Sequence, residues 1–313
     1  MAVTGLSSST AYDFRVRASN GDGLPTSFSG VVSTATLPPL PDAPGVPVPV
    51  VTSTADISWS WTASSYAAGY QVFLASKTAE LLAAPATNSF ALAGLGPNSP
   101  SGIVVRGVNV TGTGPLSASA TAYAFAMPPA ALALVSVGSA VVSLSWSPNG
   151  SPAGTVFELQ KASDAVTFAF HATYTVTAAA VGDLLASTTW DFRLRAYNGD
   201  SVATAFANTV STRTAPPPPG APGTPSAVVS STGALVWSWV AAADAAGYQV
   251  YLASKTAELL AAPATNTVTL TGFGPNGLSG IVVRGLNATA AGPLSASATA
   301  YTLAMPPAGL AVA

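Results

Sequence analysis

The 313-residue sequence contains no cysteine, so it can form neither a disulfide framework nor a thiolate metal site. Charge is also scarce, because Asp, Glu, Lys and Arg make up 7% of the residues, where soluble globular proteins carry roughly 25%. Lys and Arg number 10 against 12 Asp and Glu, which leaves a net charge of −2. This balance excludes the basic surface that nucleic-acid binding needs.

Long hydrophobic runs are missing as well, although the mean hydropathy of +0.45 is high. A helix that crosses a bilayer needs about 20 consecutive apolar residues. The best stretch, residues 130–144, is shorter and is interrupted by Gly138 and by three serines. The sequence therefore predicts no membrane span. Met1 is not followed by the pattern of a signal peptide, so we expect any export signal to lie outside this segment.

The side chains that carry catalysis are few and scattered. The only histidine, His171, falls on an expected strand among aromatic residues, which favours a structural role over a catalytic one. The acidic residues do not cluster, so the sequence predicts no metal site, no cofactor and no pair of catalytic carboxylates. Glu80 and Glu258 stand beside Lys77 and Lys255, as surface ion pairs do. We expect a protein that is not an enzyme.

An internal repeat dominates the sequence. Shifting the chain by 178 residues aligns it with itself without a gap, so that residues 74–88 (LASKTAELLAAPATN) recur unchanged as residues 252–266. Residues 114–123 (GPLSASATAY) return in the same way as residues 292–301. A fainter repeat of half that length divides each unit into two related modules, here called odd and even.

Proline-rich stretches separate the modules, because proline lacks a backbone donor and favours an extended course. The boundaries predict an odd fragment, an even module, an odd module, an even module and the first strand of a further odd module, at residues 1–38, 39–127, 128–216, 217–305 and 306–313. The first fragment lacks a counterpart of residues 136–178. We therefore expect the chain to be an excerpt of a longer array.

Alternating apolar and polar residues predict half-buried strands. In residues 57–61 (ISWSW) the isoleucine and both tryptophans share one face, and residues 235–239 (LVWSW) repeat the pattern. Residues 69–74 (GYQVFL) place Tyr70 and Val72 together on one face. Modules of about 90 residues with short strands and frequent turns are typical of a β-sandwich.

The order of these residues resembles the fibronectin type III family over essentially the whole chain. That family has a Trp ending strand B, Tyr-x-Val on strand C, and a Leu six residues before a Tyr that opens strand F, followed by Ala-x-Asn and a Gly-containing turn. Trp61 and residues 70–72 match the first half, and the second half is matched by Leu6, Tyr12, Ala18, Asn20, Gly23 and Ser27. The resemblance implies an all-β chain of tandem immunoglobulin-like sandwiches, arranged as beads on a string, in a bacterial secreted or surface repeat protein.

The predicted core is aromatic and consists of Trp59, Trp61, Trp146, Trp190, Trp237, Trp239, Tyr12, Tyr70 and Tyr248. The inward phase of all six tryptophans favours packing over stacking on sugars. In the family, the hydroxyl of the strand-F Tyr ties a corner of the sandwich to the backbone. Trp190 stands at that position in the odd module, whereas Ser101 and Ser279 stand there in the even modules. We expect the even modules to lack this bond.

Two surface features have more than one interpretation. Phe73, Val104, Tyr251 and Val282 fall on outward positions of the even modules, where they form either ordinary apolar surface or a self-assembly face. The low charge adds weight to self-assembly. The sequons at Asn109, Asn149 and Asn287 are either glycosylation sites or chance matches. Turn capping is favoured at Asn109 and Asn287, which occupy the position of the turn asparagine.

These observations predict a non-enzymatic structural protein, located outside the cell or on its surface, that forms or extends a fibre, stalk or filament. Its expected partners are copies of itself, because a heterologous contact that never closes generates a filament. Two alternatives remain open. The modules could be those of an adhesin, with a cell-surface glycan or protein as ligand, or spacers in a secreted polysaccharide-degrading enzyme.

Overall fold

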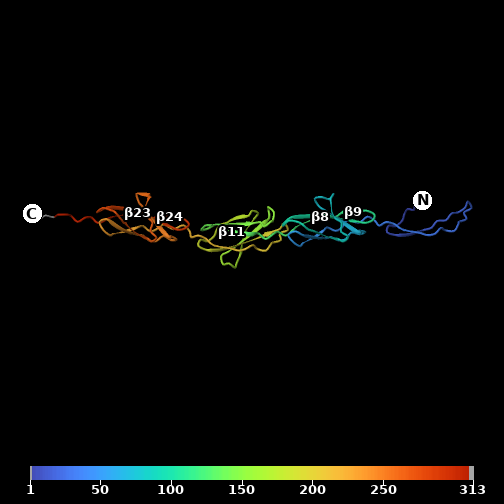
Figure 1. Cartoon of the computed structure of the whole chain (residues 1–313), viewed down its shortest axis with the longest axis horizontal. Coiled ribbons are helices and arrows are strands. Elements are labelled where there is room, and N and C mark those ends of the chain that lie inside the picture. Colours follow the sequence, from blue (N-terminus) through green and yellow to red (C-terminus); the bar gives the residue numbers. More distant parts are fainter. Residues whose placement is uncertain (1, 310–313) are drawn as a thin grey trace.

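The computed structural model describes residues 2–309, and every regular element among them is a β-strand, from β1 to β25. No helix long and apolar enough to cross a membrane occurs in this range. Figure 1 shows the strands gathered into sandwiches that follow one another in single file, with the two ends of the chain at opposite ends of the file. The molecule is therefore an extended array.

The even module at residues 39–127 contains two antiparallel sheets. One sheet has the order β3-β4-β7 and the other β10-β8-β5-β6, with β9 also paired to β8. The bounds are β3 (Val48–Val51), β4 (Ile57–Ser60), β5 (Gly69–Leu74), β6 (Leu81–Ala83), β7 (Ser89–Leu92), β8 (Pro100–Val108), β9 (Thr113–Leu116) and β10 (Ala120–Tyr123). Because β6, the fourth strand of the module, pairs with β5, it belongs to the sheet that contains the long strand β8.

The odd module at residues 128–216 repeats this arrangement with sheets β11-β12-β15 and β14-β13-β16-β17. Its strands are β11 (Ala130–Val137), β12 (Val142–Ser147), β13 (Val156–Ala162), β14 (Ala169–Tyr174), β15 (Ala178–Val181), β16 (Thr189–Tyr197) and β17 (Val210–Arg213). Register shifts between β11 and β12 occur at two places, which marks β-bulges on that edge of the sheet.

The second even module has the same topology as the first, with sheets β18-β19-β22 and β21-β20-β23-β24, and β25 also on β23. Its strands are β18 (Ser226–Val229), β19 (Ala234–Ser238), β20 (Gly247–Leu252), β21 (Lys255–Ala261), β22 (Thr267–Thr271), β23 (Leu278–Leu286), β24 (Ala291–Leu294) and β25 (Ala298–Tyr301). Residues 306–309 form no strand, and the rest of the predicted further strand, residues 310–313, lies outside the described residues.

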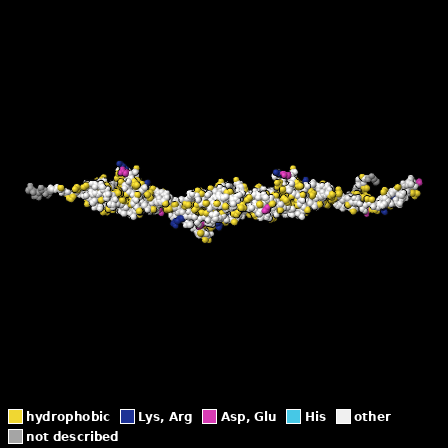
Figure 2. Space-filling view, in the orientation of Figure 1, with side chains coloured by type: hydrophobic (Ala, Val, Ile, Leu, Met, Phe, Trp, Pro, Cys, Tyr) yellow, Lys and Arg dark blue, Asp and Glu magenta, His cyan; other side chains and the backbone are white. Residues whose placement is uncertain are grey.

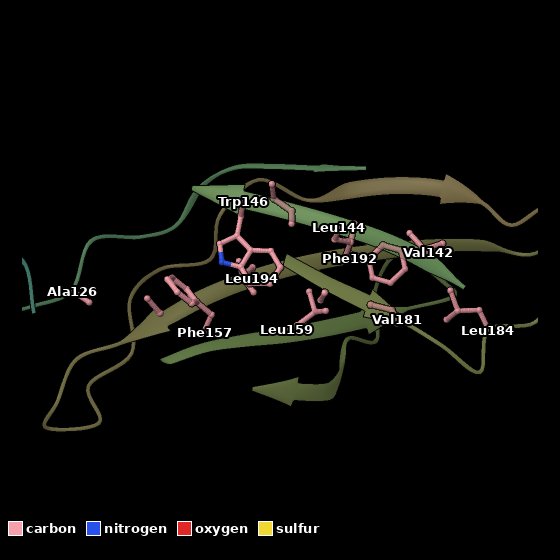
Figure 3. Packing of buried hydrophobic residues seen from close by; sticks show 13 residues of the cluster. Ala126, Val142, Leu144, Trp146, Phe157, Leu159, Val181, Leu184, Phe192 and Leu194 are labelled. Carbon is pink, nitrogen blue, oxygen red and sulfur yellow. The ribbon is translucent and has the colours of Figure 1, made fainter. Parts of the chain in front are cut away.

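The core of each sandwich contains a pair of aromatic rings in edge-to-face contact. In the odd module the Trp146 ring lies 5.8 Å from Phe157 at an interplanar angle of 66°, an edge-to-face contact across the core (Figure 3). In the even modules the equivalent pair is Trp61 with Tyr70, at 5.4 Å and 73°. Five of the predicted core tryptophans are almost fully buried: Trp59, Trp61, Trp146, Trp237 and Trp239. Tyr70 and Tyr248 are buried with them.

Two residues of the predicted core, Tyr12 and Trp190, are only partly buried. Tyr12 is only partly covered, since β1 (Ala11–Phe14) pairs with β2 (Val32–Ala35) alone and no second sheet packs on them within the described residues. Val16 on the same hairpin is 71% exposed for the same reason. Trp190 is half-buried at the margin of the odd core, where the Lys161 ammonium lies 5.3 Å from its ring. Tyr12 therefore lies in no closed core within the described residues, whereas Trp190 packs against the odd core from its margin.

The corner contact survives in a modified form. The Tyr12 hydroxyl accepts a hydrogen bond from the Ser7 amide at 2.8 Å. In the odd module the Trp190 indole Nε1 donates to the Leu185 carbonyl at 3.5 Å. In the first even module the Ser101 hydroxyl is buried and has no partner among the described residues. The aromatic side chains of Tyr12 and Trp190 thus tie the corner to the backbone. In the first even module, Ser101 makes no such bond within the described residues.

Candidate functional site

No group of His, Cys, Asp and Glu that could hold a metal ion occurs in residues 2–309. His171 lies on β14, where burial and then the charge of Lys161 lower its pKa below the ordinary value. Burial of this kind disfavours the charged imidazolium. No side chain is hydrogen-bonded to His171 within the described residues.

Glu158 on β13 is a buried acid, at 6% exposure. Its carboxylate accepts hydrogen bonds from Arg195 Nη2 at 2.8 Å, from the Tyr197 hydroxyl and from Gln160. Burial raises the pKa of Glu158, but these hydrogen bonds outweigh burial and hold it below the ordinary value. The carboxylate therefore stays ionised near neutral pH and braces the outer face of the odd module.

The predicted self-assembly face is not exposed. Phe73, Val104, Tyr251 and Val282 are between 4% and 7% exposed. In the first even module, Phe73 is flanked in register by Val104 on β8 and Leu81 on β6. The prediction that these residues form an exposed contact surface is wrong. Their side chains point away from the core, but side chains of neighbouring strands cover them.

A cation completes that cover in both even modules. The Arg106 guanidinium lies 5.0 Å from the Phe73 ring, and Arg284 lies 5.0 Å from the Tyr251 ring. Arg284 Nη2 also donates to the Tyr251 hydroxyl at 2.6 Å. These cation–π contacts shield the aromatic faces from water.

Each even module carries a Lys and a Glu on a hairpin that projects from the file. Figure 1 shows the β5–β6 and β20–β21 hairpins on one side and the β13–β14 hairpin on the other, and Figure 2 shows charged side chains at the tips of the first two. Lys77 and Glu80 lie 3.7 Å apart and are 64% and 75% exposed, as are their repeats Lys255 and Glu258 at 71% and 53%. The predicted surface ion pairs are confirmed. Exposed pairs of this kind contribute little stability.

Asn109 and Asn287 cap turns and fasten the proline-rich stretches that precede their modules. Asn109 Nδ2 donates to the Pro39 carbonyl at 2.6 Å, and its Oδ1 accepts from the Thr111 amide at 2.8 Å. Asn287 repeats the contact with the Pro217 carbonyl at 2.7 Å. We call residues 38–41 and 216–219 the straps. The turn-capping interpretation is confirmed, since Oδ1 of Asn109 and of Asn287 accepts hydrogen bonds from two backbone amides of its own turn.

A different contact joins the first even module to the odd module after it. Asn98, in the turn before β8, accepts from the Gly199 amide at 2.7 Å through Oδ1. Its Nδ2 donates to the Thr155 hydroxyl at 3.0 Å. Asn98 is 9% exposed and adopts φ 52°, a left-handed conformation that asparagine tolerates better than most residues. One asparagine of the even module thus bonds two separate parts of the odd module.

The turn at residues 198–200 (Asn-Gly-Asp) supplies the rest of the contact. Asp200 Oδ2 accepts from the Tyr123 amide at 2.7 Å, while Asn198 Nδ2 donates to the carbonyls of Tyr123 and Ala124 at 3.1 and 3.3 Å. A Cβ placed on Gly199 would lie 2.5 Å from the Tyr123 ring. Glycine is therefore required there because the ring rests directly on the backbone. We call this set of contacts the seam.

Apolar cover completes the seam. Ala126, in the tail of the even module, is 4% exposed and belongs to the core cluster of the odd module. Beside it lies an apolar hollow of about 310 Å³, between Phe125 and residues 202–205. The hydrogen bonds and the shared core make residues 39–216 a continuous packed body.

The seam was not predicted from the sequence, although a signal for it exists. The odd copies read Asn-Gly-Asp at residues 20–22 and 198–200, whereas the even copies read Asn-Val-Thr at 109–111 and Asn-Ala-Thr at 287–289. The same turn position therefore carries two sequences that alternate with the modules. This alternation indicates that the two kinds of turn meet different surfaces.

Comparisons with known proteins find partial similarity to two of them. No family model matches the sequence. The chain is 38% identical over 136 residues to endoglucanase B of Cellulomonas fimi, a match that covers 40% of this chain and spans 13% of the length of that protein. The crystal structure of chicken CNTN1 FN1-FN3 domains matches 85% of this chain and the whole of its own length, with 17% identity and a TM-score of 0.36.

The fold class follows from the strand pairing. Each complete module has one three-stranded sheet packed against a second sheet, in which the long strand β8, β16 or β23 pairs with β5, β13 or β20 and with strands that follow it in the chain. This is the two-layer architecture of fibronectin type III domains. The predicted fold is confirmed: the chain is an all-β array of tandem fibronectin-type-III-like β-sandwiches.

Proposed function

We propose that this chain is a non-catalytic, extracellular spacer that holds whatever it connects at a fixed separation. The observation that carries the proposal is the single file of sandwiches (Figure 1), in which the seam fixes one joint and the straps restrict the others. Inter-domain contacts bonded in this way resist the relative motion that bare linkers allow. An extended, semi-rigid body suits a spacer better than a container for a ligand.

The partial likeness to a protein named endoglucanase B supports the same proposal. An endoglucanase cuts within glucan chains, and polymers of that size are met outside the cell. The match covers a small fraction of that protein, so it supports a role as accessory modules and not catalysis by this chain.

Small-angle X-ray scattering tests the shape. A compact chain of this length would have a radius of gyration of about 20 Å. We expect roughly twice that value, with a scattering profile typical of a rod. A value close to 20 Å would contradict the proposal.

A binding assay separates the spacer from an adhesin or a sugar-binding module. The purified chain is incubated with insoluble cellulose and, separately, with glycan arrays. We expect it to remain in the soluble fraction and to give no array signal, because five of its six tryptophans are buried in cores. Retention on either material would favour the binding role and refute the spacer.

A further inference from the structure

The first even module has an apolar hollow of about 380 Å³ beside the corner residue Ser101. Side chains of both sheets line it, and we call it the corner hollow. Its lining includes four leucines, which lie on β5, β6 and β7 and just after β7: Leu74, Leu82, Leu92 and Leu95. Sites that bind small molecules are clefts of about 300–1,000 Å³ that are mostly apolar and carry a few polar groups. The corner hollow therefore has the size and the lining of such a site.

Ser101 supplies a polar group to this apolar lining. The side chain is 6% exposed, and its hydroxyl has no hydrogen-bond partner among residues 2–309. Side chains alternate along a strand, so Ser101 shares a face of β8 with Ile103, which is 0% exposed. The hydroxyl thus points into the module. A buried hydroxyl without a partner costs free energy, which a ligand that bonds to it would restore.

The odd module shows what kind of group fits this place. Trp190 stands there at the position of Ser101, and its ring packs against the odd core. The ring lies 5.3 Å from the ammonium of Lys161, which takes the place in register that Leu74 has in the even module. The indole Nε1 donates to the Leu185 carbonyl. An aromatic ring with a polar hydrogen therefore occupies the counterpart of the corner hollow.

The second even module places a ring at the same corner from a different position. Phe273 stands where Leu95 stands 178 residues earlier, and it packs against the core of its module. The backbone is held alike in both copies. The Phe273 amide donates to the Gly233 carbonyl at 3.2 Å, and the Leu95 amide donates to the Ala55 carbonyl at 2.9 Å. This position therefore accepts an aromatic side chain without a change of fold.

We propose that the corner hollow of the first even module is a binding site for small phenols. The aromatic ring lies among the leucines, as the Trp190 ring lies at this corner of the odd module. The phenol hydroxyl pairs with the Ser101 hydroxyl, since each of these groups both donates and accepts. Apolar cavities lined by leucine bind simple aromatic rings such as benzene. The inference goes beyond the spacer role and is independent of it, because that role depends on shape.

Nuclear magnetic resonance of the leucine methyl groups in the intact chain tests the proposal. The probe is p-cresol, which has the structure of a tyrosine side chain. An aromatic ring shifts the resonances of methyl groups beside it, so p-cresol should shift those of the four leucines that line the corner hollow. We expect a dissociation constant between about 0.1 and about 10 mM. Resonances of these leucines that do not move at saturating p-cresol would overturn the proposal.

Leu95→Phe is the variant that blocks the site. It gives the first even module the ring that Phe273 already places in the second, so the module keeps its fold. The affinity for p-cresol should fall at least about tenfold. Leu116→Phe is the matched control, because it makes the same substitution at a 40% exposed position on β9. Equal affinities in the two variants would show that the phenol binds elsewhere.

Ser101→Ala tests the hydrogen bond separately from the hollow. The variant removes a hydroxyl that has no partner among the described residues, so the module should stay folded. Its affinity for p-cresol should fall about fivefold, because the phenol hydroxyl loses its partner. Toluene, the same ring without the hydroxyl, should bind to Ser101→Ala and to the parent chain with equal affinity. A loss of the same size for both compounds, or for neither, would refute the assignment of Ser101.

Discussion

The strongest test of the seam is Gly199→Ala. The backbone of Gly199 does not have a positive φ, so alanine introduces no conformational strain there. The whole effect comes from the new Cβ, which would lie 2.5 Å from three atoms of the Tyr123 ring. Forcing extra atoms into a packed contact costs about 1–3 kcal/mol. That cost shifts the balance between closed and open seam about 5- to 150-fold toward the open form.

Opening the seam also releases hydrogen bonds. The bonds from Gly199, Tyr123 and Asn198 across the seam all depend on the position of the turn. Each contributes about 1 kcal/mol when formed and solvates when broken. We therefore expect the two modules of Gly199→Ala to stay folded while their relative orientation becomes variable.

Single-molecule fluorescence energy transfer measures that orientation. The chain has no cysteine, so dyes can be attached through Thr78→Cys and Val166→Cys, two exposed positions on the projecting hairpins of the adjoining modules. We expect a narrow distribution in the parent chain and a broad one in Gly199→Ala. Gly182→Ala, which meets open space in the same module, is the control. A distribution as narrow in Gly199→Ala as in the control would refute the reasoning.

Three further results are expected, each measurable by differential scanning calorimetry. Trp237→Ala should destabilise its module by about 3–5 kcal/mol, because the side chain is 0% exposed, whereas Trp190→Ala should cost only about 1 kcal/mol at its half-buried site. Asn109→Ala should cost about 1–2 kcal/mol and lower the midpoint of its module by several degrees, because it releases the strap. The odd module should lose stability as pH falls below about 4, the ordinary range of a carboxyl, since burial is outweighed by hydrogen bonds that lower the folded pKa of Glu158. Glu158→Gln should flatten that pH dependence, and an unchanged profile would refute the assignment.

The fold could be predicted because its main signals are local and repeated. Alternation in residues 57–60 identifies β4, and the observed burial follows the same alternation, with Ile57 and Trp59 inside. The proline-rich stretches and the 178-residue repeat then divide the chain without reference to any distant contact. The alternation of apolar residues and the proline-rich boundaries are both patterns among neighbouring residues, so a single sequence is enough to show them.

The surfaces could not be predicted in the same way. Phe73 has the outward phase that the pattern indicates, yet Arg106 and Leu81 cover it from other strands. Tyr12 has the inward phase but lacks a sheet to pack against in the described residues. The position of a residue along a strand determines the face to which its side chain points. Whether that side chain is buried depends on which other segments of the chain cover the face.

The seam also explains why the sequence repeats as a pair of modules. In the even modules, Val110 and Ala288 occupy the turn position that Gly199 has in the odd module. If the odd module were deleted, the tail of the first even module would meet the turn of the second, and the Ala288 methyl group would collide with the Tyr123 ring, which leaves no room for a Cβ. Gene duplications that keep pairs intact avoid this collision. An array of this kind therefore keeps the seam intact when it lengthens or shortens in steps of two modules.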